Sequence, residues 1–290
     1  MIIATLIAAG RLSRDSIGEA SSALRDAGVE PGDWRWLDEG SAADLDLSGE
    51  LATARTVSLP GLDLIVQPAE QREKKLLVAD MDSTMIGQEC IDELADYAGV
   101  KERVADITER AMQGELDFAA ALRERVALLD GLSRDIIDLC RAERVRVNPG
   151  AKTLVRTMRA RGAATLLVSG GFTAFAAPIA EEIGFEHVRA NRLGANGPLL
   201  DGTVEGDIVD SVAKRSALVE LRDRLGIDPA AVMAVGDGAN DVPMVEEAGL
   251  GIAYRAKPVL AAAADARLDH NGLDALLWVQ GIRRDEWVSG

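Results

Sequence analysis

The chain has 290 residues, of which 48% are hydrophobic and 3% aromatic, and its formal net charge is −16 at pH 7. This length suits two domains, and the aliphatic, alanine-rich composition is typical of α/β proteins. The excess of 48 acidic over 32 basic residues repels nucleic acid and anionic membrane surfaces, so neither is an expected partner.

The cysteines and histidines form no metal-binding pattern. Cys90 and Cys140 are far apart in sequence, and His187 and His270 are isolated. We therefore expect reduced, packed thiols and no Cys/His zinc site. The apolar segment at residues 1–11 lacks a preceding basic region and is too short to span a bilayer, so the cytoplasm is the expected compartment.

Residues 1–72 are predicted to form a small N-terminal α+β domain. Its predicted elements are a strand at Ile2–Ala8, a helix that ends at Gly28, a half-buried strand around Trp34 and Trp36, a loop at 39–50 and a short strand at 61–68. The charged stretch 69–75 is the predicted linker to the rest of the chain.

From residue 73 to residue 290 the pattern changes to strand–helix alternation. Strands are predicted at 75–80, 164–172, 187–210 (several short ones), 230–241 and 250–254, and helices at 148–162, 173–184, 213–226, 242–249 and 258–264. This order predicts a Rossmann-like parallel sheet with helices on both faces.

A long helical region separates the first two of these strands. Residues 87–147 are almost wholly helical in pattern, and an insertion at this point is most economically a cap over the edge of the sheet. We place the cap at about 86–148. Asn148 and Pro149 are the predicted hinge that lets the cap open for exchange.

Reactive polar residues follow three of the predicted strands. They are Asp80 and Asp82 after the first strand, Ser169, Gly170 and Gly171 after the second, and Asp237 and Asp241 after the third. In an open parallel sheet the functional crevice lies outside the carboxyl ends of the strands. Each motif alone is common in ordinary turns, but their recurrence at equivalent strand ends is specific. Lys214 adds the cation that such a group of carboxylates requires.

This set of residues suits phosphoryl transfer through an acyl-phosphate. A carboxylate is a competent nucleophile toward phosphorus. Hard oxygen ligands favour Mg²⁺, for which Asp80, Asp237 and a backbone carbonyl near Asp82 are the predicted ligands. Ser169 and Lys214 are placed to hold phosphoryl oxygens. Asp82 is placed to protonate the leaving alkoxide and then to deprotonate the attacking water.

The sequence resembles the phosphoserine phosphatase family of the haloacid dehalogenase superfamily over roughly residues 73–270. The resemblance rests on the successive motifs DMDST, SGG, Lys214 and GDGANDVPM, on the helical cap, and on the longer matches DMDSTMIGQECIDELADYAGV and ITERAMQGELDFAAALRERVALL. It implies Mg²⁺-dependent hydrolysis of O-phospho-L-serine to L-serine and phosphate through an aspartyl-phosphate, the last step of serine biosynthesis.

The resemblance also implies a role for each core motif residue. Asp80 is then the nucleophile and Asp82 the general acid and base. The phosphoryl group is held by Ser169, Gly170, Gly171, Lys214 and Asn240. The magnesium ion is bound by Asp80, Asp82 and Asp237, while Asp241 supports the metal and the lysine.

In the cap, the resemblance implies that Glu89 binds the substrate ammonium and Arg125 its carboxylate, with Met112 and Phe118 as an apolar lid. At about 100° per residue, one apolar stripe is formed by Leu122, Val126 and Leu129. Arg125 lies at the edge of this stripe, whereas Arg123 projects to solvent. The planar fork of an arginine suits a carboxylate, although a plain ion pair with a cap glutamate is the alternative.

Other interpretations stay open. Residues 1–72 are shorter than a full ACT regulatory domain, and we interpret them as a reduced ACT-like domain. The same core could act on another phosphomonoester, such as phosphohomoserine or a nucleotide. A phospho-accepting receiver or binding module is a remote alternative, because receivers lack the second aspartate and the cap. A monomer or homodimer acting on a small-molecule substrate is expected.

Overall fold

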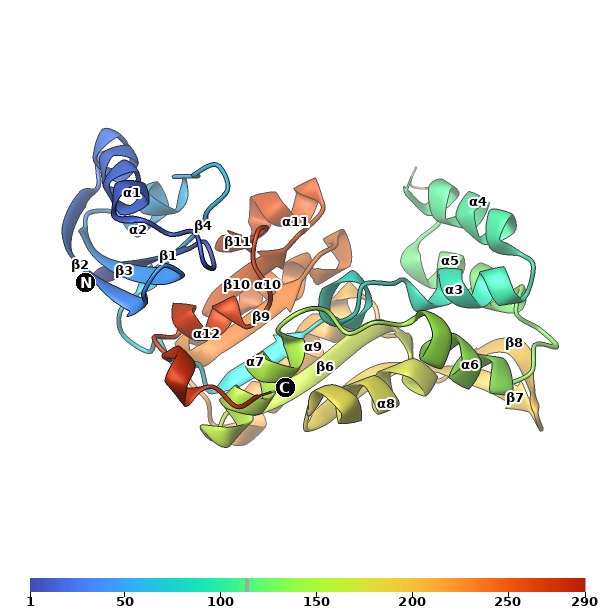
Figure 1. Cartoon of the computed structure of the whole chain (residues 1–290). Coiled ribbons are helices and arrows are strands. Elements are labelled where there is room, and N and C mark those ends of the chain that lie inside the picture. Colours follow the sequence, from blue (N-terminus) through green and yellow to red (C-terminus); the bar gives the residue numbers. More distant parts are fainter. Residues whose placement is uncertain (113–114, 290) are drawn as a thin grey trace.

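The computed structural model describes residues 1–112 and 115–289, except the side chain of Met112. Figure 1 shows an N-terminal sheet with its helices at one end of the molecule, a larger sheet with its helices in the middle, and a helical cap at the other end. The smaller sheet has four strands and the larger has seven.

The N-terminal sheet has a ferredoxin-like topology. Its elements are β1 (Ile2–Ile7), α1 (Arg14–Asp26), β2 (Glu30–Asp38), β3 (Ala42–Ser48), α2 (Leu51–Arg55) and β4 (Asp63–Pro68). The strand order is β2-β3-β1-β4, every pair is antiparallel, and the connection is βαββαβ. The predicted small α+β unit is therefore present. Its outer boundary at residue 72 and its ACT-like nature stay predictions.

The stretch 39–50, predicted to be a loop, instead contains β3. The sequence AADLDLS alternates apolar and acidic residues, and its acidic residues resemble those of a surface turn. Asp44 is fully buried, where it accepts hydrogen bonds from Thr5 Oγ1 at 3.0 Å and from Arg72 at 2.6 Å. These partners stabilise the buried carboxylate. The prediction was wrong because they are remote from Asp44 in sequence and leave no local signal.

The large sheet consists of β5 (Leu76–Ala79), β6 (Ala164–Phe172), β7 (His187–Asn196), β8 (Leu199–Glu205), β9 (Val232–Gly236), β10 (Leu250–Tyr254) and β11 (Ala266–Leu268). Its order is β11-β10-β9-β5-β6-β7-β8. All neighbours are parallel except β7 and β8. This confirms the predicted parallel sheet and adds an antiparallel strand at one edge and β11 at the other.

Helices cover both faces of this sheet. They are α7 (Ala151–Ala160), α8 (Thr173–Ile183), α9 (Ser211–Leu225), α10 (Val242–Glu247), α11 (Pro258–Ala263) and α12 (Ala275–Val279). Leu154, Ile179 and Trp278 belong to one buried cluster, and Leu218, Met244 and Leu260 to the other. A layer of helices on each face explains why β5, β9 and β10 are buried throughout. None of the helices in the described part of the chain has the length and apolar character needed to cross a membrane.

The predicted cap consists of α3 (Cys90–Tyr97), α4 (Lys101–Met112), α5 (Phe118–Ala127) and α6 (Asp135–Arg144), inserted between β5 and β6. Its two connections to the core pair with each other through an antiparallel bridge between Ile86 and Val147. Asn148 strengthens this stem, because its backbone N–H donates to Met85 O at 2.9 Å and its side chain donates to Thr84 O at 2.8 Å. Both cysteines are buried free thiols, as predicted.

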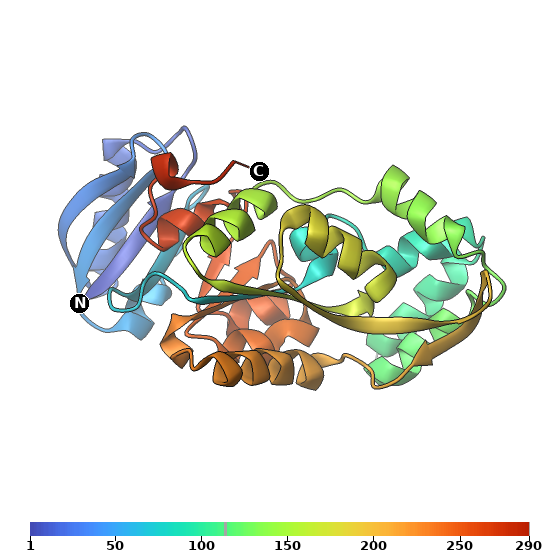
Figure 2. The ribbon, with the colours of Figure 1, turned by 90° about the horizontal axis from the view of Figure 1, so that it is seen from below.

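The cap has a second attachment to the core. The hairpin of β7 and β8 extends beside the cap helices, which Figure 2 shows from below. Gly131 N–H donates to Leu200 O at 2.9 Å, and Leu200 N–H donates to Leu132 O at 2.9 Å. The cap is therefore attached to the core by this hairpin as well as at the predicted hinge of Asn148 and Pro149.

Buried polar groups fasten the N-terminal sheet to the core. The carboxylate of Asp63 accepts the backbone N–H groups of residues 269–271 at 2.8–3.2 Å. Arg72 pairs with Asp44 and also donates to Val279 O at 2.7 Å. The segment predicted to be a linker is thus packed between the two sheets, and its Lys74 is only 4% exposed.

Candidate active site

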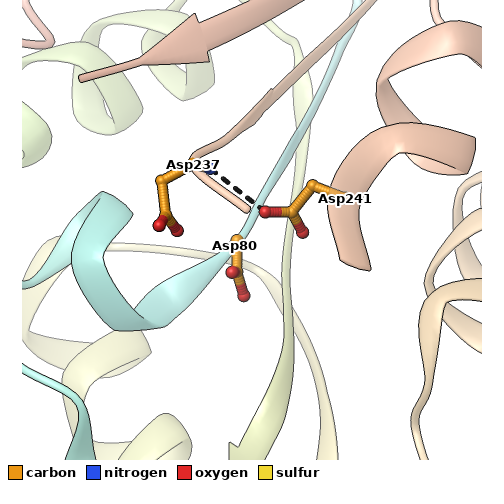
Figure 3. A group of neighbouring side chains, drawn as sticks. All are labelled: Asp80, Asp237 and Asp241. Carbon is orange, nitrogen blue, oxygen red and sulfur yellow. Dashed lines mark hydrogen bonds between the residues drawn. The ribbon is translucent and has the colours of Figure 1, made fainter. Parts of the chain in front are cut away.

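The carboxyl ends of β5, β6 and β9 lie next to one another in the sheet, and we call the region outside them the crevice. Asp80 follows β5, Ser169 lies near the end of β6, and Asp237 follows β9. One carboxylate oxygen from each of Asp80, Asp237 and Asp241 lies within 4.8 Å of the other two, and all three residues are buried (Figure 3). The structure therefore brings together the residues that the sequence places at equivalent strand ends.

A single buried lysine joins two of these carboxylates. Lys214 is 1% exposed, and its Nζ lies 2.7 Å from Asp80 Oδ1 and 2.7 Å from Asp241 Oδ1. Burial alone would lower the pKa of Lys214, but the charges of the two aspartates outweigh burial and raise this pKa above its usual range. Lys214 therefore stays a cation inside the crevice.

The first turn of α9 positions this lysine. Asp210 is the N-cap of α9, and its carboxylate accepts the backbone N–H of Ala213 at 2.8 Å. The backbone N–H of Lys214 donates to Asp210 O at 2.9 Å. A capped first turn has a defined geometry. The backbone of Lys214 is therefore held in place while its side chain extends toward Asp80 and Asp241.

Both oxygens of the Asp241 carboxylate accept hydrogen bonds from protein donors. Its Oδ1 binds Lys214, and its Oδ2 accepts the backbone N–H groups of Asp237 and Gly238, each at 3.1 Å. A Cβ at Gly236 would lie 2.5 Å from Asp241 Cγ, so this close approach requires glycine. Asp80 and Asp237 therefore have the freer oxygens, although Asp237 Oδ1 accepts a hydrogen bond from Thr84 Oγ1 at 3.2 Å.

The crevice contains more negative than positive charge. Burial and the charge of Asp241 raise the pKa of Asp80 well above its usual range, although Lys214 opposes this. Burial, Asp241 and Glu89 raise the pKa of Asp237 to about 6. Burial and Glu89 raise the pKa of Asp82 to about 7. A divalent cation would relieve this repulsion, and the all-oxygen donor set fits such an ion.

A tight turn at Met81–Met85 joins the core to the base of the cap. Ser83 has the left-handed φ of 55°, a strained backbone conformation that is common at functional sites. Asp82 Oδ1 accepts the backbone N–H of Cys90 at 3.0 Å, and Ser83 Oγ donates to Glu89 Oε1 at 2.7 Å. Asp82 and Glu89 are therefore held on the same side of this turn.

A bulge in β6 places Ser169 and the two glycines beside Asp82. The Ser169 hydroxyl lies 3.4 Å from Asp82 Oδ2 and accepts the Gly171 N–H at 2.8 Å. A Cβ at Gly171 would lie 2.7 Å from Asp82 Oδ2 and 3.0 Å from Ser169 Oγ. Any other residue at this position would have to displace the side chain of Asp82 or Ser169.

Arg125 of the cap has no ion-pair partner in the part of the chain that the structure describes. Leu122 and Val126 on α5 and Leu129 just after it are buried. Arg123 is exposed and Arg125 is half-buried, as the helical geometry predicts. Burial lowers the pKa of Arg125, while the charges of Asp92 and Glu89 oppose this. Its Nε donates to Ala121 O at 3.3 Å. Among the described residues no carboxylate forms an ion pair with it, so the alternative pairing with a cap glutamate is not seen there.

The apolar lid is only partly described. A Cβ at Gly170 would lie 3.0 Å from Phe118 Cζ, so the Phe118 ring covers the backbone of the β6 bulge. Met112 ends α4, and its side chain lies outside the described residues. Asn240 lies in the turn Ala239–Asp241, half-buried beside Gly238.

Comparisons with known proteins agree with this geometry. Residues 74–249 match the model of the haloacid dehalogenase-like hydrolase family. The chain belongs to the haloacid dehalogenase-like hydrolases. It is 46% identical to a phosphoserine phosphatase of Polaromonas sp. (strain JS666) over 225 residues, which cover 75% of this chain and 95% of that protein.

Solved structures of this hydrolase family are similar over the same region and beyond it. The structure of a probable phosphoserine phosphatase from Vibrio cholerae in its unliganded form has a TM-score of 0.80 and 32% identity, and the match covers 96% of this chain and 86% of that one. A substrate-bound phosphoserine phosphatase complex has a TM-score of 0.66 and 38% identity, covering 71% of this chain and 98% of that one.

Sequence reasoning missed three polar residues around the site of this hydrolase. Thr84 donates a hydrogen bond to Asp237, and the negative charge of Asp92 opposes the lowering of the Arg125 pKa by burial. Asn191 donates a hydrogen bond to the β6 bulge. The sequence could have indicated Asp92, because it lies about one helical turn after Glu89 and therefore on the same side of the helix. Thr84 follows directly on the paired aspartates. No local signal marks Asn191, because its contacts are long-range.

Proposed function

We propose that this hydrolase is a magnesium-dependent phosphoserine phosphatase. The observation that supports this most is the pairing of two sites in one crevice. The core supplies the Asp80 carboxylate, which is held by Lys214. The cap supplies Arg125, which has no ion-pair partner among the described residues and experiences the charge of Glu89. The relatives that bear the name phosphoserine phosphatase support the same substrate.

We propose Asp80 as the nucleophile. Its Oδ1 is occupied by Lys214 and by the Met81 N–H at 2.8 Å, which leaves Oδ2 to attack phosphorus. The new Oδ2–P bond forms while the bond from phosphorus to the serine oxygen breaks. Asp82 gives its proton to the departing alkoxide. It then takes a proton from the water that attacks phosphorus, while the Oδ2–P bond breaks and inorganic phosphate leaves. A pKa of about 7 suits both roles of Asp82.

The phosphoryl oxygens are proposed to bind Ser169, the backbone of Gly170 and Gly171, Lys214 and Asn240. Lys214 is already poised at 2.7 Å from the nucleophile, so its charge acts where negative charge develops. This preorganisation is the main contribution of the core residues.

We propose that Asp80, Asp237 and the backbone carbonyl of Asp82 hold Mg²⁺. The raised pKa values of the first two carboxylates support this, because they indicate a buried negative charge that a cation would balance. When bound, the ion supplies charge neutralisation and Lewis-acid stabilisation of the phosphoryl group. Asp241, whose oxygens are occupied, orients Lys214 and the chain at Asp237.

The cap residues are proposed to select the amino-acid part of the substrate. Arg125 binds the carboxylate, Glu89 the ammonium, and Phe118 with Met112 covers the site. A nucleotide has no use for this pair of charges, which disfavours it as a substrate. Phosphohomoserine differs by one methylene, a difference that an apolar pocket discriminates only weakly.

We further propose a cytoplasmic enzyme of serine biosynthesis that is a monomer or homodimer. Residues 1–72 are proposed to be a reduced ACT-like domain, which the ferredoxin-like topology supports. Residues 73–290 then form the phosphatase core, with the cap inserted at about 86–148.

The test is release of inorganic phosphate from O-phospho-L-serine, with Mg²⁺ or with EDTA, by wild type and by Asp80→Asn. We expect release that requires Mg²⁺ and is lost in the variant. Release from another phosphomonoester only would refute the proposed substrate. A long-lived phosphorylated Asp80 with negligible release would instead support the receiver alternative.

A further inference from the structure

The bulge in β6 leaves backbone groups that the sheet cannot pair. β6 and β7 pair at Val168 with Arg189 and next at Phe172 with Asn191. Ser169–Gly171 therefore face a single residue of β7. Since buried backbone groups need hydrogen-bond partners, the bulge requires donors from outside the ladder.

The side chain of Asn191 supplies this missing interaction. Asn191 is 1% exposed, its Nδ2 donates to Gly170 O at 2.7 Å, and its Oδ1 accepts the Val209 N–H at 2.8 Å. The partners fix the orientation of the amide, because a carbonyl only accepts and an N–H only donates. One side chain thus bridges the bulge and the segment that leads into α9.

Both ends of this bridge adjoin the site of phosphoryl transfer. Gly170 lies between Ser169 and Gly171. Val209 directly precedes Asp210, the N-cap of the helix that bears Lys214. One buried amide therefore links the bulge to the segment that leads to Lys214.

We propose that Asn191 is a positioning residue for the phosphoryl site. It acts through the Ser169–Gly171 bulge and through Lys214, without contact to the substrate. This inference rests on the proposed function and deepens it. Because both groups stabilise charge in the transition state, Asn191 governs kcat and the binding of transition-state mimics more than substrate affinity.

Two variants of Asn191 distinguish a positioning role from a general contribution to folding. Asn191→Asp keeps the shape and the acceptor for Val209 N–H, but it cannot donate to Gly170 O when ionised. Asn191→Ala removes both bonds. The matched control is Asn271→Ala, since Asn271 is 6% exposed and bridges Ala9 N–H and Ile7 O at the contact between the two sheets.

Steady-state kinetics with O-phospho-L-serine, and calorimetric binding of orthovanadate with Mg²⁺, are measured where circular dichroism shows each variant folded. We expect both Asn191 variants to lose roughly 10- to 100-fold in kcat and a similar factor in orthovanadate affinity. KM should change by less than about threefold. Asn271→Ala should retain kcat and orthovanadate affinity, whatever its melting temperature.

Folded Asn191 variants with wild-type kcat and orthovanadate affinity would overturn the inference, as would equal losses in Asn271→Ala. Failure of the proposed function gives a different result. Wild type would then bind orthovanadate without releasing phosphate from O-phospho-L-serine. The comparison of orthovanadate affinities needs no turnover, so it decides the role of Asn191 in that case as well.

Discussion

The cations of the crevice have different surroundings. Lys214 is bound to two aspartates at 2.7 Å each, whereas the half-buried Arg125 has no carboxylate in ion-pair contact among the described residues. A desolvated guanidinium without a partner is unfavourable until an anion reaches it. We therefore expect the loss of activity on removing Arg125 to depend on whether the substrate has a carboxylate.

Arg125→Ala should lower kcat/KM for O-phospho-L-serine by roughly 100-fold or more, because a charge-assisted bidentate interaction is lost. Activity on p-nitrophenyl phosphate, which has no carboxylate, should change by less than about threefold. The control is Arg123→Ala on the exposed side of α5. Equal losses on both substrates would contradict a carboxylate-binding role.

Gly171→Ala should lower kcat by roughly 10-fold or more, because the new Cβ would lie 2.7 Å from Asp82 Oδ2 and displace the proposed acid and base. Gly18→Ala, in an open position on α1, is the control and should leave kcat unchanged. Steady-state rates with Mg²⁺ measure both. An unchanged kcat in Gly171→Ala would show that Asp82 has room to move without loss.

At the scale of elements, helix α9 connects local structure to catalysis. Asp210→Ala removes the N-cap of α9 and should cost about 1 kcal/mol of unfolding free energy. It should also lower kcat by roughly 10-fold, because Lys214 lies in the frayed turn. Ser13→Ala removes the equivalent cap of α1 and should cost a similar free energy with no loss of kcat. Chemical denaturation and steady-state rates distinguish the two effects.

The sequence predicted the strand–helix alternation and the strand-end residues because these follow from local periodicity. It failed where long-range contacts decide the structure. β3 contains the buried Asp44, whose partners belong to β1 and to the segment after β4. β11 and α12 are too short to show a period. Asn191 went unnoticed for a related reason, since its partners lie 21 and 18 residues away.

For the molecule as a whole, the net charge of the protein has the same sign as the charge of the substrate. A net charge of −16 repels a phosphorylated amino acid. Lys214 from the core and Arg125 from the cap supply positive charge at the crevice, and the charge of Lys257 also acts on Asp237. We therefore expect the closed arrangement of cap and core to be needed for tight binding of such an anion.

The contact between the two sheets contains a buried lysine. Lys74 Nζ donates to Ala230 O at 2.9 Å and to Gln71 O at 3.1 Å, and burial lowers the pKa of Lys74 to about 8, although Asp265 opposes this. The unfolded chain then binds more protons than the folded one between pH 8 and the ordinary lysine value of 10.5. Stability from this group is therefore gained as the pH rises through that window.

The difference in unfolding free energy between wild type and Lys74→Met should shift in favour of wild type by about 2–3 kcal/mol from pH 8 to pH 10.5. Urea denaturation at a series of pH values measures this. Lys75→Met, at an exposed neighbour, should show no such shift. A flat difference for Lys74→Met would mean that the lysine is charged and satisfied in the folded state.

The contact made by Asp63 also bears on the order in which the chain folds during synthesis. Residues 1–68 leave the ribosome well before residues 269–271, whose backbone N–H groups donate hydrogen bonds to Asp63. Until those residues emerge, this carboxylate and the face of the sheet around it have only water as a partner. We therefore expect the nascent N-terminal sheet to become fully stable only when nearly the whole phosphatase core has been translated.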